Sequence, residues 1–219
     1  VVATGIEDAP RVIGNRTEVF VRAGFVRDFA LAASTRFSHR DRTVGGVNVR
    51  SWFVDGHEAS GARALDAAAH SMRIFARRFG AYPYTELDVV EAPLVGGAGG
   101  VEFSGMVTIA NMFYQPMSAG PQGGVLGSLL AGGSAQDLEA RRESMIEFVT
   151  AHEVSHQWWH GLVGSDSREH PFQDECLAQY SAVLYMQERY GAERARRETE
   201  QQVTAGYHMM RLMGGTDAA

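Results

Sequence analysis

The chain has 219 residues, of which 45% are hydrophobic and 21% are charged, so it is long enough to bury a core as one large domain. Its 26 acidic residues outnumber its 20 basic residues, which argues against a protein that binds the phosphate backbone of nucleic acids. A single cysteine excludes an internal disulfide framework, and no apolar run in the sequence has the length of a membrane span.

The first half of the chain is predicted to consist mainly of strands around one helix. Branched and aromatic residues alternate or cluster in TEVFVRAGFVRDFALAAS and GVNVRSWFV, which predicts strands within the first 58 residues. Apolar residues then recur at spacings of three and four, which predicts a helix from Ser60, as N-cap, to Phe79. YPYTELDVVEAP predicts a turn and a strand, and GGAGGVEFSGMVTIAN predicts a glycine-rich lead into one further strand over 101–110.

The second half is predicted to be helical after a long glycine-rich segment. Residues 114–135 are dense in Gly, Pro and Ser, which indicates a mobile surface insertion without the order of a phosphate-binding loop. Helices are then predicted over 137–161, 171–190 and 192–212.

The segment HEVSHQWWHG places two histidines, His152 and His156, four positions apart, with Glu153 directly after the first. Four residues of α-helix rotate the side chain by roughly 400°, so both imidazoles emerge on one face and can reach one ion. Glu153 is turned by about 100° from His152 and is therefore poorly placed to be a ligand. The H-E-x-x-H pattern is typical of zinc sites in which two imidazoles bind the metal and the glutamate faces a water molecule. A chance occurrence in an ordinary helix is the alternative.

A third ligand is needed because catalytic zinc takes three protein ligands and leaves the fourth position for water. Eighteen residues separate His156 from Glu175, which opens the next predicted helix within PFQDECLAQYSAVLY. Two antiparallel helices would bring both histidines and Glu175 together. The other layout requires a histidine six residues after His156, where the sequence has Leu162.

Several polar neighbours of these residues have an ordinary structural interpretation. His160 is about 80° from His152 on a continuous helix, which favours a position at the rim of the site. Asp174 is expected to be a cap or a surface charge. Gln179, one turn beyond Glu175, either orients a ligand or is a surface glutamine.

HEVSHQWWHGLVGSD, the eighteen-residue gap and DECLAQY together resemble the gluzincin aminopeptidases, the zinc peptidases related to membrane alanyl aminopeptidase. The resemblance extends from about Phe29 to about Gly191. It implies one catalytic Zn²⁺ per chain, with Glu153 as general base and acid. The ligands that it implies are His152, His156 and Glu175.

The resemblance also implies a site for the amino terminus of a peptide. GGVEF, residues 99–103, stands where that family has a Gly-x-Met-Glu-Asn motif, whose glutamate grips the free amine. By position this role passes to Glu102, and Gly99, Gly100 and Val101 would offer backbone groups to a substrate that lies as an added strand. Val101 replaces the usual Met and Phe103 the usual Asn. A solvated strand carboxylate is the alternative for Glu102.

The fold implied is α+β, a thermolysin-like (zincin) catalytic domain in which a mixed β-sheet is followed by the zinc-binding helices. Residues 1–28 are then the tail end of an N-terminal β-domain, and residues 29–219 a catalytic domain truncated on its C-terminal side. The partners implied are peptides with a free N-terminus and the remaining domains of a longer chain, with no nucleic acid and no membrane-spanning segment. The compartment stays open, and an exported or cell-envelope location in a bacterium is favoured over the cytoplasm.

The function implied is that of a zinc-dependent metallopeptidase that removes amino-terminal residues by attack of activated water. A thermolysin-like endopeptidase is one alternative, in which Glu102 is dispensable. A zinc-binding but inactive scaffold or interaction domain is another, because the family's oxyanion-stabilising tyrosine is not found and Tyr207, the only late candidate, is too close to Glu175.

Overall fold

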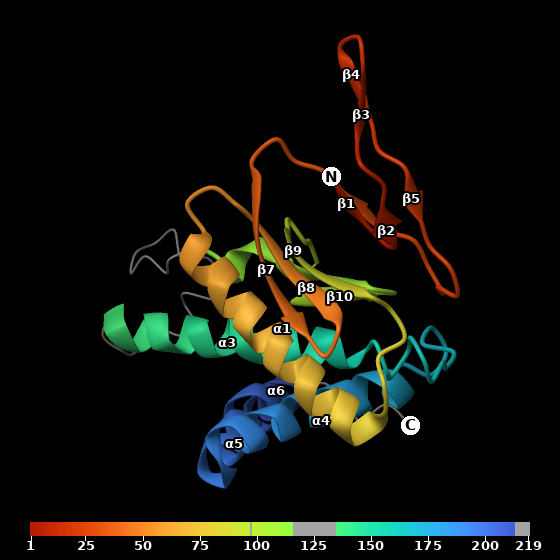
Figure 1. Ribbon diagram of the computed structural model, residues 1–219. Coiled ribbons are helices and arrows are strands. Elements are labelled where there is room, and N and C mark those ends of the chain that lie inside the picture. The colour runs from red at the N-terminus through yellow and green to blue at the C-terminus, as the bar shows by residue number, and fades with distance from the viewer. Residues whose placement is uncertain (97, 116–134, 213–219) are drawn as a thin grey trace.

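A computed structural model describes residues 1–96, 98–115 and 135–212. The predicted insertion over 114–135 lies almost entirely outside the described residues. Small strand pairs at the N-terminus lead into one five-stranded sheet, and the helices lie against and below that sheet (Figure 1). The structure is therefore α+β with a mixed sheet.

The five-stranded sheet has the order β10-β11-β9-β8-β7. Its members are β7 (Phe37–Val44), β8 (Val47–Val54), β9 (Glu86–Ala92), β10 (Gly100–Phe103) and β11 (Met106–Ala110). The three central strands are parallel, and both outer strands pair antiparallel with their neighbours. Strand β10 therefore forms an edge of the sheet.

The prediction of one strand over 101–110 is wrong, because a turn divides this segment into the hairpin β10–β11. The turn contains Gly105 with φ +73°, a left-handed conformation that glycine adopts without a steric penalty. Glu102 therefore lies on the edge strand, two residues before the turn.

The N-terminal strands form three antiparallel pairs, β1–β6, β2–β5 and β3–β4. Their bounds are Val2–Ala3, Ile6–Glu7, Arg11–Ile13, Arg16–Glu18, Val21–Arg22 and Leu31–Ala32 for β1 to β6. The β3–β4 hairpin projects away from the rest of the chain (Figure 1). These short strands agree with the strand pattern predicted for the first 58 residues.

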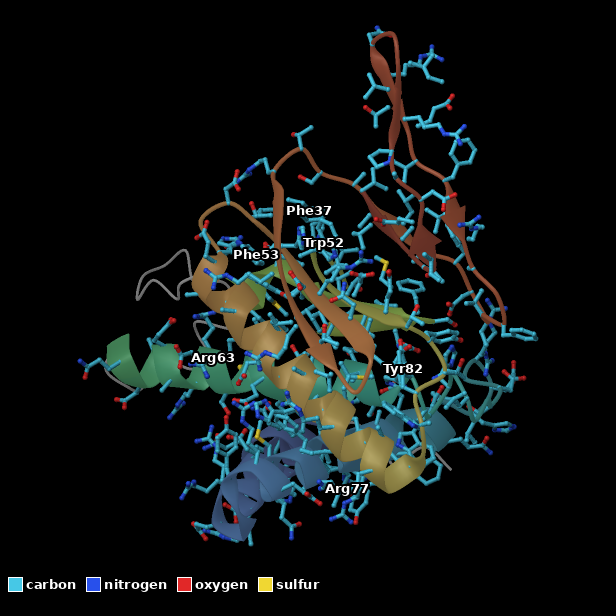
Figure 2. The ribbon with its side chains drawn as sticks, viewed as in Figure 1. Phe37, Trp52, Phe53, Arg63, Arg77 and Tyr82 are labelled. Atoms are coloured by element: carbon cyan, nitrogen blue, oxygen red, sulfur yellow. The ribbon has the colours of Figure 1, made fainter. Side chains whose placement is uncertain are left out.

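Helix α1 (Glu58–Phe79) covers the face of the sheet formed by β7 to β9. Strand β8 alternates buried and half-buried residues along its length, and Phe53 is one of the buried side chains that face the helix. Phe37 and Trp52 belong to a second cluster on the other face of the sheet (Figure 2). The predicted start at Ser60 is wrong: the helix begins at Glu58, and the buried Ser60 hydroxyl donates instead to the Tyr114 carbonyl at 3.0 Å.

Helices α3 (Ala135–Ser155) and α4 (Phe172–Tyr190) carry the H-E-x-x-H motif and the predicted third ligand. The chain continues through a 3-10 turn before the gap (Asn111–Phe113) and, after α4, through α5 (Ala192–Glu198), a π-helical segment (Thr199–Thr204) and α6 (Ala205–Leu212). The predicted helix over 137–161 ends earlier than expected, because the chain leaves the α-helical conformation after Ser155.

Helices α3 and α4 run antiparallel and share a buried carboxylate. Glu147 on α3 accepts hydrogen bonds from Tyr185 at 2.5 Å and from Tyr190 at 2.7 Å, and Arg189 lies 3.1 Å from it. Within the part of the chain that the structure describes, no helix is both long and apolar enough to cross a membrane.

Gly61 supplies a test of the contact between α1 and the sheet. A Cβ atom at this position would overlap the Phe53 ring. We expect Gly61→Ala to lower the free energy of unfolding by about 1–3 kcal/mol through overpacking. Gly206→Ala is the matched control, because this helical glycine has open space around it and the change should stabilise α6 by up to about 1 kcal/mol. Urea denaturation measures both, and equal effects would contradict the packing described for α1.

Candidate metal centre

Three predicted ligands meet where the end of α3 packs against the start of α4. The His152 Nε2 atom lies 3.2 Å from both the His156 Nε2 atom and the Glu175 Oε2 atom. The His156 Nε2 atom lies 3.9 Å from the same Glu175 oxygen. A tetrahedral site with bonds of about 2.0–2.2 Å separates its ligand atoms by about 3.3–3.5 Å, so these three atoms have nearly the spacing that one Zn²⁺ requires.

Each of the two imidazoles makes a hydrogen bond through its Nδ1 atom, which leaves its Nε2 atom to face Glu175. The His152 Nδ1 atom lies 3.0 Å from the Gln179 Oε1 atom, and the His156 Nδ1 atom lies 2.9 Å from the Trp159 carbonyl oxygen. Both oxygens accept hydrogen bonds, so a proton on each Nδ1 satisfies them, and this tautomer leaves each Nε2 lone pair available to a metal. Both Nε2 atoms lie on the side of Glu175. Burial also lowers the pKa of His156 below its ordinary value, which favours the neutral form that binds metals.

The donor set thus fits a divalent metal that takes nitrogen and oxygen ligands. Two neutral imidazoles and one carboxylate form a common catalytic zinc set, and second-sphere partners such as Gln179 are typical of metal-binding histidines. Gln179 therefore contacts His152, as a group that orients a ligand would, and this contact favours that alternative over a surface glutamine.

Glu153 lies beside these ligands and is 5% exposed. Its carboxyl group packs so closely on Gly100 that a Cβ atom there would overlap it. Burial raises the pKa of Glu153 well above the usual value of a glutamate, and the nearby carboxylates of Glu102 and Glu175 raise it further.

A cavity of about 390 Å³ contains most of the predicted site residues. It is lined by Gly99, Gly100 and Glu102 from the β10 side and by His152, Glu153, Glu175 and Gln179 from the helices. Val101 is different, because its side chain lies on the opposite face of the strand and lines a separate cavity of about 770 Å³. Val101 can therefore contribute to the candidate site through its backbone only.

The β10–β11 hairpin is held in place by hydrogen bonds with Gln157, just after α3, and with Asp28. Neither role was predicted from the sequence. The Gln157 side chain is 2% exposed, donates to the Phe103 carbonyl at 2.9 Å and accepts from the Gly105 N–H at 2.8 Å. On the other side, the Asp28 carboxylate accepts from the Ser104 N–H at 2.8 Å. The only feature of the sequence that could have indicated the role of Gln157 is its position directly after the candidate ligand His156.

His160 lies beside the candidate site, as predicted, whereas Asp174 is more deeply buried than predicted. The helix has ended before His160, so the angle of 80° that placed it at the rim does not apply. The Asp174 side chain is 3% exposed and its Oδ2 atom lies 3.4 Å from the His160 Nδ1 atom, so Asp174 is not a surface charge.

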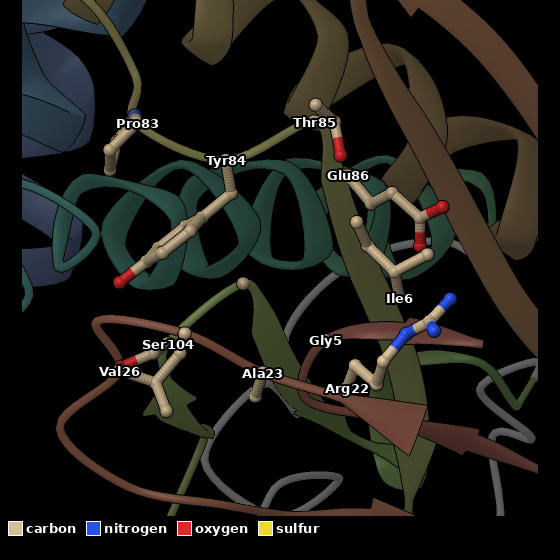
Figure 3. A pocket seen from close by; sticks show the side chains of 12 residues that line it. Gly5, Ile6, Arg22, Ala23, Val26, Pro83, Tyr84, Thr85, Glu86 and Ser104 are labelled. Atoms are coloured by element: carbon tan, nitrogen blue, oxygen red, sulfur yellow. The ribbon is translucent and has the colours of Figure 1, made fainter. Parts of the chain in front are cut away.

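Another pocket, of about 190 Å³, lies between the N-terminal strands and the turn before β9 (Figure 3). Arg22, Tyr84 and Glu86 line it, and none of the three predicted ligands does. It is therefore distinct from the candidate metal centre.

Comparisons with known proteins give partial similarities to aminopeptidases, and no protein-family model matches the chain. Aminopeptidase M1-B of Oryza sativa subsp. japonica is 28% identical over 145 residues, which cover 65% of this chain and 14% of that protein. Aminopeptidase M1-A of the same organism is 27% identical over 146 residues, with the same two coverages of 65% and 14%. Aminopeptidase 2 of Candida albicans is 29% identical over 118 residues, which cover 53% of this chain and 11% of that protein.

These similarities support an aminopeptidase-like relationship. The matched part of the chain spans 14% or less of the length of each relative.

Gln179 supplies a test of the metal centre that does not depend on activity. We expect Gln179→Ala to weaken zinc binding by about 10–100-fold, because His152 loses the partner that fixes its ring and proton. Gln187→Ala is the control, since Gln187 is an exposed glutamine on the same helix. Competition with a chromophoric chelator measures both affinities. Equal affinity of the two variants would exclude the role of Gln179.

Proposed function

We propose that this chain carries the catalytic centre of a zinc-dependent aminopeptidase, built on a thermolysin-like α+β domain. The observation that carries the proposal is the convergence of the His152 and His156 Nε2 atoms on the Glu175 carboxylate, beside a cavity that Glu102 and Glu153 also line. His152, His156 and Glu175 would hold one Zn²⁺ per chain. When bound, the zinc supplies a Lewis acid that polarises a peptide carbonyl and makes water more acidic.

Glu153 is assigned the proton transfers. It is buried beside the candidate ligands, and its rotation of about 100° from His152 on α3 favours a role other than that of a third ligand to the same ion. A carboxylate in this place takes a proton from the attacking water and passes it to the leaving amine. The Glu153 carboxyl group occupies the space that a side chain at Gly100 would fill.

Glu102 is assigned the recognition of the substrate's amino terminus. It faces the same cavity as Glu153, and among the described residues no hydrogen bond reaches its carboxylate. A substrate ammonium group would give it a charge-assisted hydrogen bond, which an internal peptide segment cannot supply. The edge position of β10 supports this arrangement, because the backbone of Gly99, Gly100 and Val101 can pair with a peptide as an added strand.

The substrates proposed are therefore peptides with a free N-terminus. The relatives extend far beyond the matched region, so we also propose that further domains contribute to substrate binding in the complete protein. An endopeptidase and an inactive scaffold are the two alternatives. Substitution of Glu102 tests the first, and substitution of Glu153, together with the activity of the unmodified protein, tests the second.

Glu153→Gln tests the chemistry separately from metal binding. The variant should retain one equivalent of zinc and lose activity on aminoacyl-anilides by about 10²–10⁴-fold, because it cannot accept the proton. Elemental analysis and initial rates measure the two properties, in this chain and in any longer native chain that contains it. Glu18→Gln, on the distant β3–β4 hairpin, should change neither. Zinc binding without hydrolysis in the unmodified protein would favour the scaffold.

Glu102→Gln tests the selection of the free amine. The substitution keeps the shape and removes the charge, so kcat/KM for free aminoacyl-anilides should fall by about 10–100-fold, the range expected for a charge-assisted hydrogen bond. Cleavage of N-acetylated substrates should stay at its low starting level. Efficient cleavage of blocked peptides by the unmodified protein, with no effect of this substitution, would establish the endopeptidase instead.

A further inference from the structure

His160 has a backbone conformation that is unfavourable for its residue type. Among the residues that the structure describes, Phe25 and His160 are the two non-glycine residues with positive φ, and His160 has φ +121°. A side chain is disfavoured there and glycine is not, because the Cβ atom crowds the backbone. Such conformations persist where the surrounding structure enforces them, and they gather at functional sites.

The backbone of His160 is held on both sides. Its N–H donates to the Val163 carbonyl at 3.0 Å, and its own carbonyl accepts from the Arg27 Nη1 atom at 2.8 Å. A second nitrogen of Arg27 donates to the Ser165 carbonyl at 3.3 Å. The turn after α3 is therefore fixed to the segment just before Phe29, and the imidazole has a defined direction.

That direction places the imidazole among three carboxylates. The His160 side chain is 14% exposed, with its Nδ1 atom 3.4 Å from Asp174 and its Nε2 atom 3.8 Å from Asp28. One ligand-type atom each from Glu102, His160 and Asp174 lie within 4.8 Å of one another. A similar group contains Glu102, Glu153 and His156. Glu102 thus lies between the metal centre and His160.

His160 is the only basic neighbour of Glu102 in these two groups that is not a candidate metal ligand. Asp28 reinforces the arrangement, because its other oxygen accepts from the Ser104 N–H, two residues after Glu102. The same carboxylate therefore lies near the imidazole and holds the turn of the hairpin that carries Glu102.

We propose that His160 is a positioning residue for Glu102. Asp174 and Asp28 flank the two ring nitrogens, and the imidazole in turn keeps Asp28 in place against the Ser104 N–H, so that the hairpin turn holds Glu102 toward the cavity where a substrate ammonium group would bind. This inference rests on the proposed function, because His160 would affect the binding of the substrate amine only by fixing the position of Glu102. It also accounts for a histidine where the backbone favours glycine.

The test compares the zinc-loaded protein with its His160→Gly variant. Two probes are used, alanine hydroxamate and N-acetyl-alanine hydroxamate, which bind the metal through the same group and differ in the free amine. The substitution removes the backbone strain, so Tm should rise or stay unchanged. Affinity for the free-amine probe should fall by about 5–50-fold, while affinity for the acetylated probe should not change.

Two further variants separate positioning from a general structural effect. His160→Asn should recover part of the loss, because asparagine tolerates positive φ and retains an N–H donor. His170→Gly is the control, since His170 is an exposed histidine in the segment that leads into α4 and should leave both affinities unchanged. A fall in Tm with equal loss of both probes would overturn the proposal in favour of a structural role.

The remaining outcomes distinguish this inference from the proposed function. If the unmodified protein binds both probes equally, amine recognition by Glu102 is absent and both proposals fail. If the unmodified protein prefers the free amine and His160→Gly shows the same preference, the proposed function stands and the role of His160 is excluded.

Discussion

The hydrogen bonds and ion pairs of the buried Glu147 carboxylate, between α3 and α4, are the interactions on which the candidate metal centre depends. Two tyrosine hydroxyls from α4 donate to it, Arg189 of α4 lies 3.1 Å away and Arg63 of α1 lies 4.0 Å away, so most of its partners are lost if α4 shifts relative to α3. Loss of such a partner leaves a buried charge, at a cost of about 3–5 kcal/mol. Glu147 lies five residues before His152 on the same helix. The register that satisfies Glu147 is thus the register that brings Glu175 to the two histidines.

The proximity of the three candidate ligands could be predicted because their geometry is mostly local. The spacing of His152 and His156 places both on one side of the chain, and that relation survives although α3 ends at Ser155. His156 follows in a tighter turn, in which its N–H reaches the Glu153 carbonyl at 3.2 Å. Glu175 required only that the next helix return antiparallel to α3, and α4 does so after the connection over residues 156–171. The helices over 171–190 and 192–212 were likewise predictable from periodic apolar residues, apart from the π-helical segment.

The surroundings of the ligands could not be predicted, because they depend on contacts between distant parts of the sequence. Gln157 binds a hairpin turn 52 positions away, and Asp28 binds the same turn from 76 positions away. The hairpin itself was read as one strand, since VEFSGMVTIA has apolar and branched residues on both sides of the turn and the single Gly105 is a weak signal. The position of Asp174 at the start of a helix predicts a cap, and its carboxylate does accept from the Glu175 N–H in the first turn at 3.0 Å, but its burial against His160 depends on tertiary packing.

The charge of the cavity explains why so many contacts hold the hairpin in place. Glu102, Glu153 and Glu175 line one cavity of about 390 Å³, and none of the described residues lining it is Arg. Glu102 and Glu153 repel each other when both are ionised, which contributes to the raised pKa of Glu153 and would displace Glu102 if the hairpin were free. Gln157 and Asp28 fix the backbone on either side of the strand's end, which opposes this displacement. The same concentration of carboxylates would favour the binding of two positive groups, a divalent metal ion and the ammonium group of a substrate. Under the proposed function, a rigid hairpin therefore keeps the site acidic until its cationic ligands arrive.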